Sequence, residues 1–171
     1  MKVLARNQEK FRTVDLGRFQ IRDSLEHIPS SLETLMNDLC NDKSFTFPLL
    51  RQFKPYAELS LRRKNMGLKL LKRKGVYPYE HFTSYESLHM TEFPPKEAFY
   101  SSLNEAHISD EDYKHGKKVF KFFNCQTMDD YMQLYCGLDV ILLAEIFIKY
   151  REMVMHHFEL DPVCYLGKKM F

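Results

Sequence analysis

The stretch Tyr131–Tyr150, YMQLYCGLDVILLAEIFIKY, is the longest apolar-periodic run in the sequence. Apolar residues recur in it at helical spacing, at Leu134, Leu138, Ile141 and Leu142. Just upstream, Thr127 and Asp130 have the spacing of a capping box, which predicts that a helix begins there. From Val140 to Leu143 the run is apolar on every side, so we expect the middle of this long central helix to be buried.

Asp139 stands at the edge of this apolar segment, and Tyr135 precedes it by one helical turn. The i,i+4 spacing puts the phenol and the carboxylate on the same helix face. An ionised carboxylate beside a buried segment needs a hydrogen bond, an opposite charge or a metal. The same Tyr-x-x-x-Asp pattern also arises by chance, as a core tyrosine followed by a solvent-facing aspartate, so the rest of the chain must decide between the two interpretations.

The composition is that of a globular intracellular protein. The 171 residues fit one domain or part of a larger one, and 44% hydrophobic with 14% aromatic residues is sufficient for a packed core. The N-terminus lacks a signal-peptide apolar region, and we expect no apolar run long enough to cross a membrane. The four cysteines are irregularly spaced, which favours reduced thiols over a zinc site or a disulfide framework.

The net charge of +2 conceals a strongly basic segment. Between residues 62 and 74 there are seven cations and no acid: Arg62, Arg63, Lys64, Lys69, Lys72, Arg73 and Lys74. A local cluster of this kind is the usual footprint of a phosphate-binding surface. A nuclear-import-like cluster and a solvated helix face explain it as well, and the three interpretations stay open.

Shorter patterns in the first third of the chain predict further elements. Alternation over residues 10–25, around a turn at 15–17, predicts a β-hairpin. Ser30 and Glu33 have capping-box spacing ahead of a short helix that ends at 41–44. Residues 45–60 carry two prolines, and we expect a loop there.

The middle of the chain alternates between helical and irregular patterns. Residues 59–73 are expected to form a helix with a basic face, weakened by Gly67. Residues 81–108 are rich in aromatic side chains and broken by prolines, which predicts an ordered loop with short helices. Ser109 and Asp112 form a third capping box and open the next helix, and the central helix is expected to end near Phe158.

Five stretches, taken in order, resemble the protein-primed (organellar and viral type) branch of family B DNA polymerases, in the form carried by large self-replicating transposable elements. They are IRDSLEHIPSSLETL (21–35), KGVYPYEHF (74–82), PPKEAFYSSL (94–103), HISDEDY (107–113) and YCGLDVILLAEIF (135–147). Their joint order carries the resemblance, which extends over nearly the whole chain.

The resemblance implies an α-rich α/β fold, a partial ribonuclease-H-like 3′-5′ exonuclease fold with a β-hairpin and a long central helix. Residues 1–158 would be an incomplete exonuclease domain with an insertion at 81–123, and residues 159–171 the start of the polymerase domain. Two further acidic motifs of the family, Asp-x-Glu and Asn-x-x-(x)-(Phe/Tyr)-Asp, do not occur upstream, and the palm motifs are absent. We therefore expect an inactive fragment of a DNA-directed DNA polymerase.

The resemblance also implies roles for single residues. Tyr135 and Asp139 match the third exonuclease motif of the family, in which the Asp binds a catalytic Mg²⁺ or Mn²⁺ ion and the Tyr positions the attacking water. Lys74 and Tyr79 match a lysine and a tyrosine five residues apart, which in the family contact the scissile phosphate and hold the single-stranded 3′ end. A solvated lysine, and tyrosines packed around Pro78, would explain the same residues without a function.

The implied partner is DNA with a single-stranded 3′ end, and the basic residues at 62–74 would line the channel that leads to it. The dNTPs would bind only in the parent's polymerase domain. We expect a nuclear location and no membrane association, and leave the oligomeric state open. The alternatives are a non-catalytic DNA-binding or interaction module, derived as a remnant of such a polymerase, and a helical protein with chance motifs.

These roles make a geometric prediction. The Lys74 ammonium and the Asp139 carboxylate should lie within about 10 Å of each other, so that both reach one metal-bound phosphate. The segment KGVYPYE must cross the cleft that this pair lines, and residues 81–123 should lie clear of it. The hairpin should pack beside the central helix with an unpaired outer edge.

Overall fold

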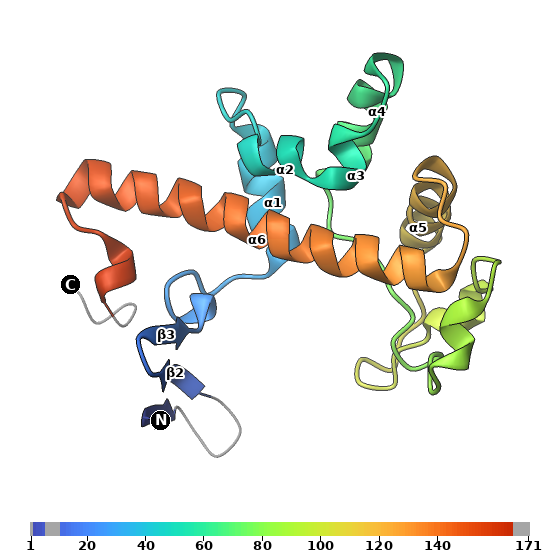
Figure 1. The fold of residues 1–171 in the computed structure, drawn as a ribbon, viewed down its shortest axis with the longest axis horizontal. Coiled ribbons are helices and arrows are strands. Elements are labelled where there is room, and N and C mark those ends of the chain that lie inside the picture. Colours follow the sequence, from blue (N-terminus) through green and yellow to red (C-terminus); the bar gives the residue numbers. More distant parts are fainter. Residues whose placement is uncertain (1, 6–10, 166–171) are drawn as a thin grey trace. The chain divides into compact units, whose positions relative to one another are not determined.

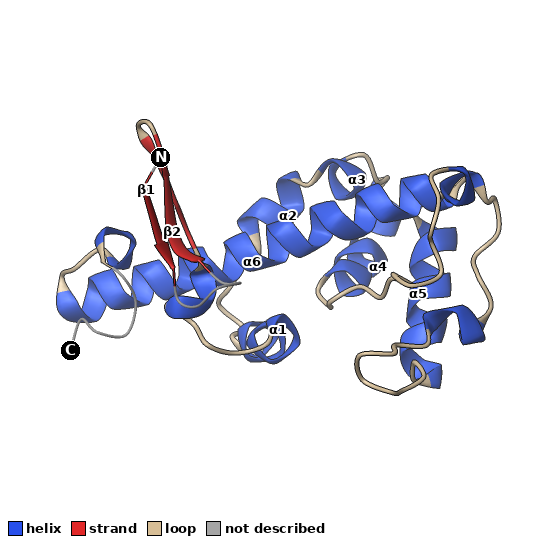
Figure 2. Ribbon diagram, turned by 90° about the horizontal axis from the view of Figure 1, so that it is seen from below, coloured by secondary structure: helices blue, strands red, loops and turns tan. Residues whose placement is uncertain are grey.

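The computed structural model describes residues 2–5 and 11–165 of the chain. It is an α-rich α/β fold in which helices predominate over a small antiparallel sheet (Figures 1 and 2). The chain divides into two compact units: unit 1 is Met1–Leu35 with Ile146–Phe171, and unit 2 is Met36–Glu145. The division passes through two helices, α1 (Leu32–Asn41) and α6 (Met128–Phe158), which therefore contribute residues to both units.

Unit 1 contains the sheet, whose strand order is β1 (Lys2–Ala5), β2 (Phe11–Leu16) and β3 (Phe19–Arg22), drawn red in Figure 2. The predicted hairpin is confirmed, since β2 and β3 pair with Val14 opposite Ile21. Its turn contains Gly17 at a φ of 61°, a conformation that favours glycine. The strand β1 was not predicted from the sequence. Among the described strands, β1 and β3 each have one edge without a partner.

Unit 1 is held together around the last part of α6. Arg22 of β3 donates to the carbonyl oxygens of Val163 and Tyr165, which follow α6, beside the 3-10 helix η4 (Pro162–Cys164). His27, just after the 3-10 helix η1 (Ser24–Glu26), is buried and meets the ring of Phe147 edge-on. The hairpin thus joins the C-terminal segment through Arg22.

One side of the hairpin faces solvent. Phe19 is 65% exposed and Ile21 is 56% exposed. These two side chains lie on the same face of β3, because alternate residues of a strand point to the same side. The face therefore remains open to solvent.

Unit 2 packs short elements around the first half of α6. They are α2 (Pro48–Gln52), α3 (Lys54–Ala57), α4 (Leu61–Leu71), α5 (Asp110–Phe122) and the 3-10 helices η2 (Glu86–His89) and η3 (Lys96–Phe99). Its buried apolar residues include Leu50, Tyr56, Leu70, Leu71, Val119, Phe120, Met128, Tyr131, Leu134, Leu138 and Leu142. The predicted helices at 59–73 and after Ser109, and the short helices within 81–108, are confirmed.

Two of the predicted capping boxes are confirmed. The Thr127 hydroxyl accepts from the amide of Asp130 at 3.3 Å, and the Asp130 carboxylate accepts in return from the amide of Thr127 at 3.0 Å. The Ser109 hydroxyl accepts from the amide of Asp112 at 3.0 Å. Both helices begin at the residue after their cap, and α6 ends at Phe158 as predicted.

The capping box predicted at Ser30 and Glu33 is wrong by one residue. Helix α1 begins at Leu32, and Ser31 rather than Ser30 accepts from the amide three residues on, that of Thr34, at 3.1 Å. Ser30 and Ser31 are adjacent, and either could cap the helix. The prediction chose Ser30 because Glu33 follows it by three residues, whereas Ser31 is the cap. Glu33 instead lies in the first turn, where its negative charge is favourable.

The loop expected at residues 45–60 is also wrong, because it contains α2 and α3. Pro48 is the first residue of α2 and Pro55 the second residue of α3. A proline suits the first turn of a helix, where its missing amide hydrogen has no intrahelical partner and its fixed φ is already helical. The prolines therefore start helices here instead of preventing them.

The middle of α6 is not buried on every side. Leu138 and Leu142 are buried, but Val140 is 67% exposed and Leu143 is 40% exposed. The helix is long and apolar enough to cross a membrane by length and composition, with a mean hydropathy of 1.6 over an 18-residue window. Our expectation that no such run exists is therefore wrong. Of this 18-residue window, 39% is buried inside the protein. A core helix of a soluble protein can have the same length and hydropathy.

Candidate functional site

A pocket of about 280 Å³ lies in unit 2 where the segment 74–79 meets α6. One side is formed by Lys74, Gly75, Val76, Tyr77, Tyr79 and Tyr135, and the other by residues between Phe99 and Ile108. The pocket therefore brings together three residues that the sequence singled out, Lys74, Tyr79 and Tyr135.

Close contacts with α6 hold the segment 74–79 in place. A Cβ on Gly75 would stand 2.7 Å from Cδ2 of Tyr135, so the absence of a side chain lets the backbone lie against that ring. The hydroxyl of Tyr131 donates to the carbonyl of Val76 at 2.7 Å. The ring of Tyr77 stacks on those of Tyr131 and Tyr135, with centroids 6.3 and 5.4 Å away. These contacts fix the backbone between the two predicted site residues that the segment carries.

The four residues with predicted site roles form one polar network. The hydroxyl groups of Tyr79 and Tyr135 are hydrogen-bonded to each other. The Tyr135 hydroxyl and the positive charge of Lys74 both act to lower the pKa of the Asp139 carboxyl. The ring of Tyr79 remains 66% exposed, whereas Tyr135 is 6% exposed.

Burial of Asp139 disfavours the ionised form of its carboxyl group. Burial raises the pKa of Asp139 above its ordinary value of 3.8, although the hydrogen bond from Tyr135 and the charge of Lys74 each act to lower it. Its Oδ1 atom is buried without a hydrogen-bond partner among the described residues. Burial also raises the pKa of Tyr135, with Tyr79 and Asp139 adding to the effect. The neutral forms of both side chains are thus favoured relative to water.

The residues around Asp139 do not fit a two-metal centre. Among residues 2–5 and 11–165, no group of three or more His, Cys, Asp or Glu side chains is arranged to hold a metal ion. Two-metal hydrolysis requires several oxygen ligands that hold the ions about 4 Å apart. One carboxylate with an unpaired oxygen fits a single ligand position, so no step of the proposed function is assigned to Mg²⁺ or Mn²⁺.

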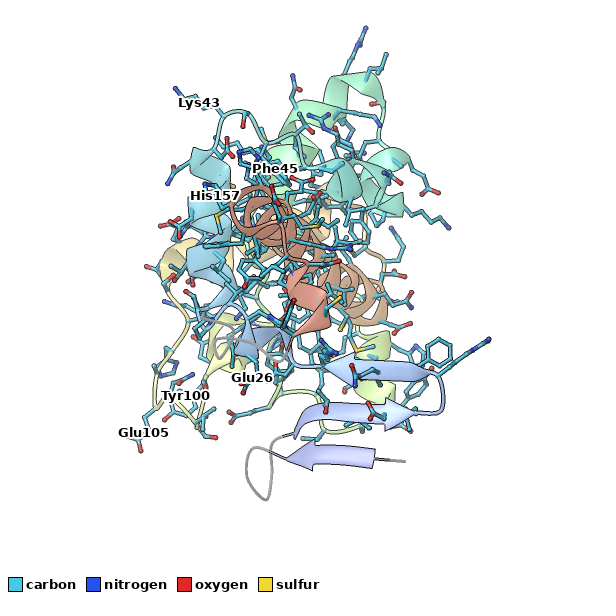
Figure 3. The ribbon with its side chains drawn as sticks, turned by 90° about the vertical axis from the view of Figure 1, so that its left-hand side faces the viewer. Glu26, Lys43, Phe45, Tyr100, Glu105 and His157 are labelled. Carbon is cyan, nitrogen blue, oxygen red and sulfur yellow. The ribbon has the colours of Figure 1, made fainter. Side chains whose placement is uncertain are left out.

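The expectation that residues 81–123 lie clear of the cleft is wrong. The pocket that Lys74 lines is also lined by Phe99, Ser101, Asn104, Ala106, His107 and Ile108. Their loop is closed by paired backbone hydrogen bonds between Ser101 and Ala106, and Figure 3 labels Tyr100 and Glu105 on it. The carboxylate of Glu80 accepts from the amide of Ser102 at 2.8 Å, which fastens the loop to the residue after Tyr79. No spacing in the sequence indicated this contact.

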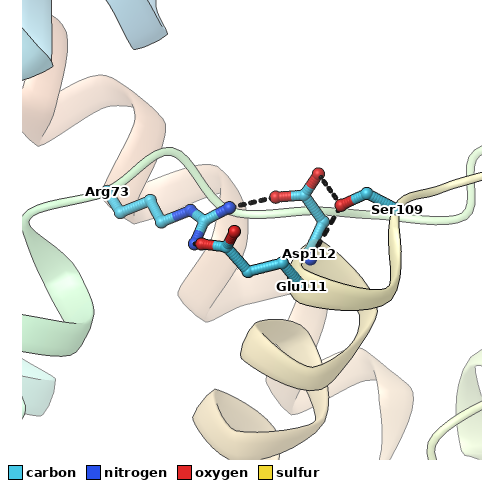
Figure 4. Close-up of polar contacts among 4 residues, drawn as sticks. All are labelled: Arg73, Ser109, Glu111 and Asp112. Carbon is cyan, nitrogen blue, oxygen red and sulfur yellow. Dashed lines mark hydrogen bonds and ion pairs between the residues drawn. The ribbon is translucent and has the colours of Figure 1, made fainter.

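The basic cluster at 62–74 does not form one free face, because several of its cations bind within unit 2. Arg73 forms ion pairs with Glu111, at 2.8 Å, and with Asp112, in the first turn of α5 (Figure 4). The ammonium of Lys72 lies 3.9 Å from the centre of the Phe47 ring. These two side chains connect the end of α4 to neighbouring elements.

The cations at the start of α4 behave in the same way. Arg63 lies over the ring of Phe122, 4.4 Å from its centre, and donates to the carbonyl of Phe122. Lys64 donates to the carbonyl of Ala57 at 3.2 Å and lies 4.8 Å from the centre of the Tyr56 ring. Arg62, Lys69 and Lys74 are exposed, and Arg63 is exposed as well despite its contacts with Phe122. A phosphate-binding surface built from the whole cluster is therefore not supported.

Sequence reasoning missed a second basic surface on α5. Lys114, Lys117, Lys118 and Lys121, together with Phe122, line a groove of about 460 Å³. The signal is present in the sequence, because positions 114, 117, 118 and 121 share one face of a helix. Counting cations along the chain did not reveal it, since apolar and polar residues separate these lysines.

Comparison of the chain with models of protein families, with curated proteins and with solved structures found no match.

Proposed function

We propose that the chain is part of a protein-primed family B DNA polymerase, and that unit 2 belongs to its ribonuclease-H-like exonuclease domain and receives a single-stranded 3′ end of DNA. The parent enzyme would perform template-directed nucleotidyl transfer with 3′-5′ proofreading. The observation that carries the proposal is the pocket that brings Lys74 and Tyr79 of one sequence motif against Tyr135 of the other, with the hydroxyl groups of the two tyrosines hydrogen-bonded.

The chemistry of each residue suits an unpaired strand end. The exposed ammonium of Lys74 is a compact cation for a phosphate oxygen. The exposed ring of Tyr79 has a face on which an unpaired base can stack, and its hydrogen bond to Tyr135 restricts its movement. A volume of about 280 Å³ lies at the lower end of the range for ligand pockets, which suits a single nucleotide better than a duplex.

A non-catalytic DNA-binding module derived from such a polymerase is the second candidate. It is favoured by one observation: Asp139 is the only carboxylate of the described network, and the surrounding donors do not suffice for a pair of metal ions. The two candidates share the same binding site and differ in whether the bound strand is cleaved.

The proposal is tested by the fluorescence anisotropy of labelled oligothymidine, with its 3′ end either free or closed in a hairpin. We expect tighter binding of the free end. Tyr79→Ala should weaken this binding at least about fivefold, because base stacking contributes roughly 1–3 kcal/mol. The matched control is Tyr85→Ala, which removes a tyrosine of similar exposure, 72%, outside the pocket lining. Equal affinity for both ends, or an equal loss in both variants, would contradict the proposal.

A further inference from the structure

Helix α5 has one face that is basic throughout. Lys114 lies three and four residues before Lys117 and Lys118, and Lys121 lies four and three residues after them, so the four side chains lie along a single stripe. Lys117, Lys118 and Lys121 are exposed to solvent. The stripe extends over about 10 Å, at a rise of 1.5 Å per residue.

The acidic residues of α5 lie at its other end and have partners there. Asp110, Glu111 and Asp112 all fall in the first turn. Asp110 is paired with Lys96, and the other two are paired with Arg73 (Figure 4). Of the four lysines, Lys114 acts on Asp110 one helical turn earlier. Lys117, Lys118 and Lys121 lie beyond the acidic turn, so this part of the stripe presents an excess of positive charge.

The stripe borders a groove with an aromatic end. The groove of about 460 Å³ is lined by the four lysines and by Phe122. Arg63 of α4 lies against the ring of Phe122 and donates to its carbonyl, which adds a guanidinium beside the groove. Proteins that bind single-stranded nucleic acids combine a basic groove with aromatic rings. The phosphates contact the cations, and the bases stack on the rings.

We propose that this groove binds the phosphodiester backbone of single-stranded DNA. A length of about 10 Å corresponds to roughly three phosphates of a strand whose bases stay stacked as in a duplex, where the rise is about 3.4 Å per nucleotide. The ammonium groups stand on flexible stems and act as point charges, so they accommodate a strand without selecting a sequence. This surface shares no residue with the Lys74–Tyr79 pocket, and the proposal stands whether or not that pocket binds a 3′ end.

The test compares the salt dependence of oligothymidine binding in the wild-type chain and in a K117A/K118A/K121A variant. Each lost contact with a single strand removes about 0.7 from the slope of log K against log salt, so the slope should flatten by roughly 2. Alanine favours the helix, and circular dichroism should show that α5 is retained. Replacement of the same three lysines by arginine should preserve the slope, because it preserves the charge.

The matched control is an R18A/K43A/K54A variant, which loses the same charge from exposed positions on other elements; Figure 3 labels Lys43. Its slope should flatten by much less than that of the α5 variant. An unchanged slope in the α5 variant, or equal flattening in both, would overturn the proposal. Tighter competition by polyglutamate than by oligothymidine would assign the groove to an acidic peptide instead. A separate measurement tests the 3′-end pocket. If that pocket does not bind the strand end, Tyr79→Ala will leave the preference for a free 3′ end over a closed end unchanged.

Discussion

Gly75 determines how closely the two halves of the candidate site approach. A side chain at this position would meet the ring of Tyr135, so Gly75 permits the contact between the segment 74–79 and α6. On either side of it, the charge of Lys74 acts to lower the pKa of Asp139, and the hydroxyl of Tyr79 is hydrogen-bonded to that of Tyr135. The sequence identified these residues by their type and spacing, but the packing against Gly75 becomes visible only in the fold.

Asp139 gives a prediction for the pH dependence of stability. Its folded-state pKa is raised, chiefly by burial, so the folded protein holds this proton more tightly than the unfolded chain. Ionisation therefore costs stability as the pH rises above the ordinary carboxyl value of 3.8. Asp139→Asn, which stays neutral, should be more stable than the wild type near pH 7, and the difference should shrink as the pH falls below 4.

Urea denaturation of both proteins across this range measures the effect. Asp129→Asn, at an earlier position of the same helix, serves as the control and should not show the same pH-dependent gain. A wild-type protein that is more stable than the Asn variant at neutral pH would show that the interaction with Lys74 outweighs the desolvation of Asp139.

The elements were predictable where local chemistry determines them. The capping boxes of α5 and α6 and the turn at Gly17 use hydrogen bonds and backbone angles within a few residues, which a sequence displays directly. The errors came from choices that local chemistry leaves open: which of two serines caps α1, and whether Pro48 begins a helix or prevents one. Contacts between distant residues decide such cases.

Helix α2 shows how a distant residue decides. Its N-terminus follows Phe47, which has a positive φ of 54° and makes no side-chain capping bond. The cap comes instead from Glu145 on α6, whose Oε1 accepts from the amide of Leu50 at 2.7 Å. Glu145 is fully buried, and burial raises its pKa while the backbone amides lower it. No sequence pattern near α2 could have indicated this carboxylate.

Removal of this cap should destabilise unit 2. Glu145→Ala leaves a buried amide without its acceptor, which should lower the free energy of unfolding by roughly 1–3 kcal/mol. Glu145→Gln keeps an acceptor oxygen without the charge and should cost less. Chemical denaturation measures both, with Glu152→Ala, an exposed glutamate on the same helix, as the control. Equal loss in the Ala and Gln variants would show that the charge matters more than the hydrogen bond.

Over the whole molecule, the charge is arranged differently from its order in the sequence. The dense run at 62–74 contributes Arg63, Lys64, Lys72 and Arg73 to contacts inside unit 2. The dispersed lysines of α5 instead form a continuous stripe. The number of cations per stretch of sequence therefore overestimated the basic surface at 62–74 and overlooked the one on α5. Helical periodicity and the positions of acids and aromatic rings decide which cations face solvent.

If the proposed site receives a DNA strand, cleavage of that strand depends on how many carboxylates surround it. In the described residues the network contains Asp139 alone, whereas hydrolysis by two metal ions needs several such ligands. We therefore expect the 171-residue chain to bind single-stranded DNA without releasing nucleotides from it in the presence of Mg²⁺ or Mn²⁺. The measurement is the release of label from a 3′-labelled strand over time. The control is Asp139→Ala, because release that persists in this variant comes from a contaminating nuclease. Release that disappears with Asp139 would contradict the prediction, and it would show that other groups of the chain complete a metal centre around this carboxylate.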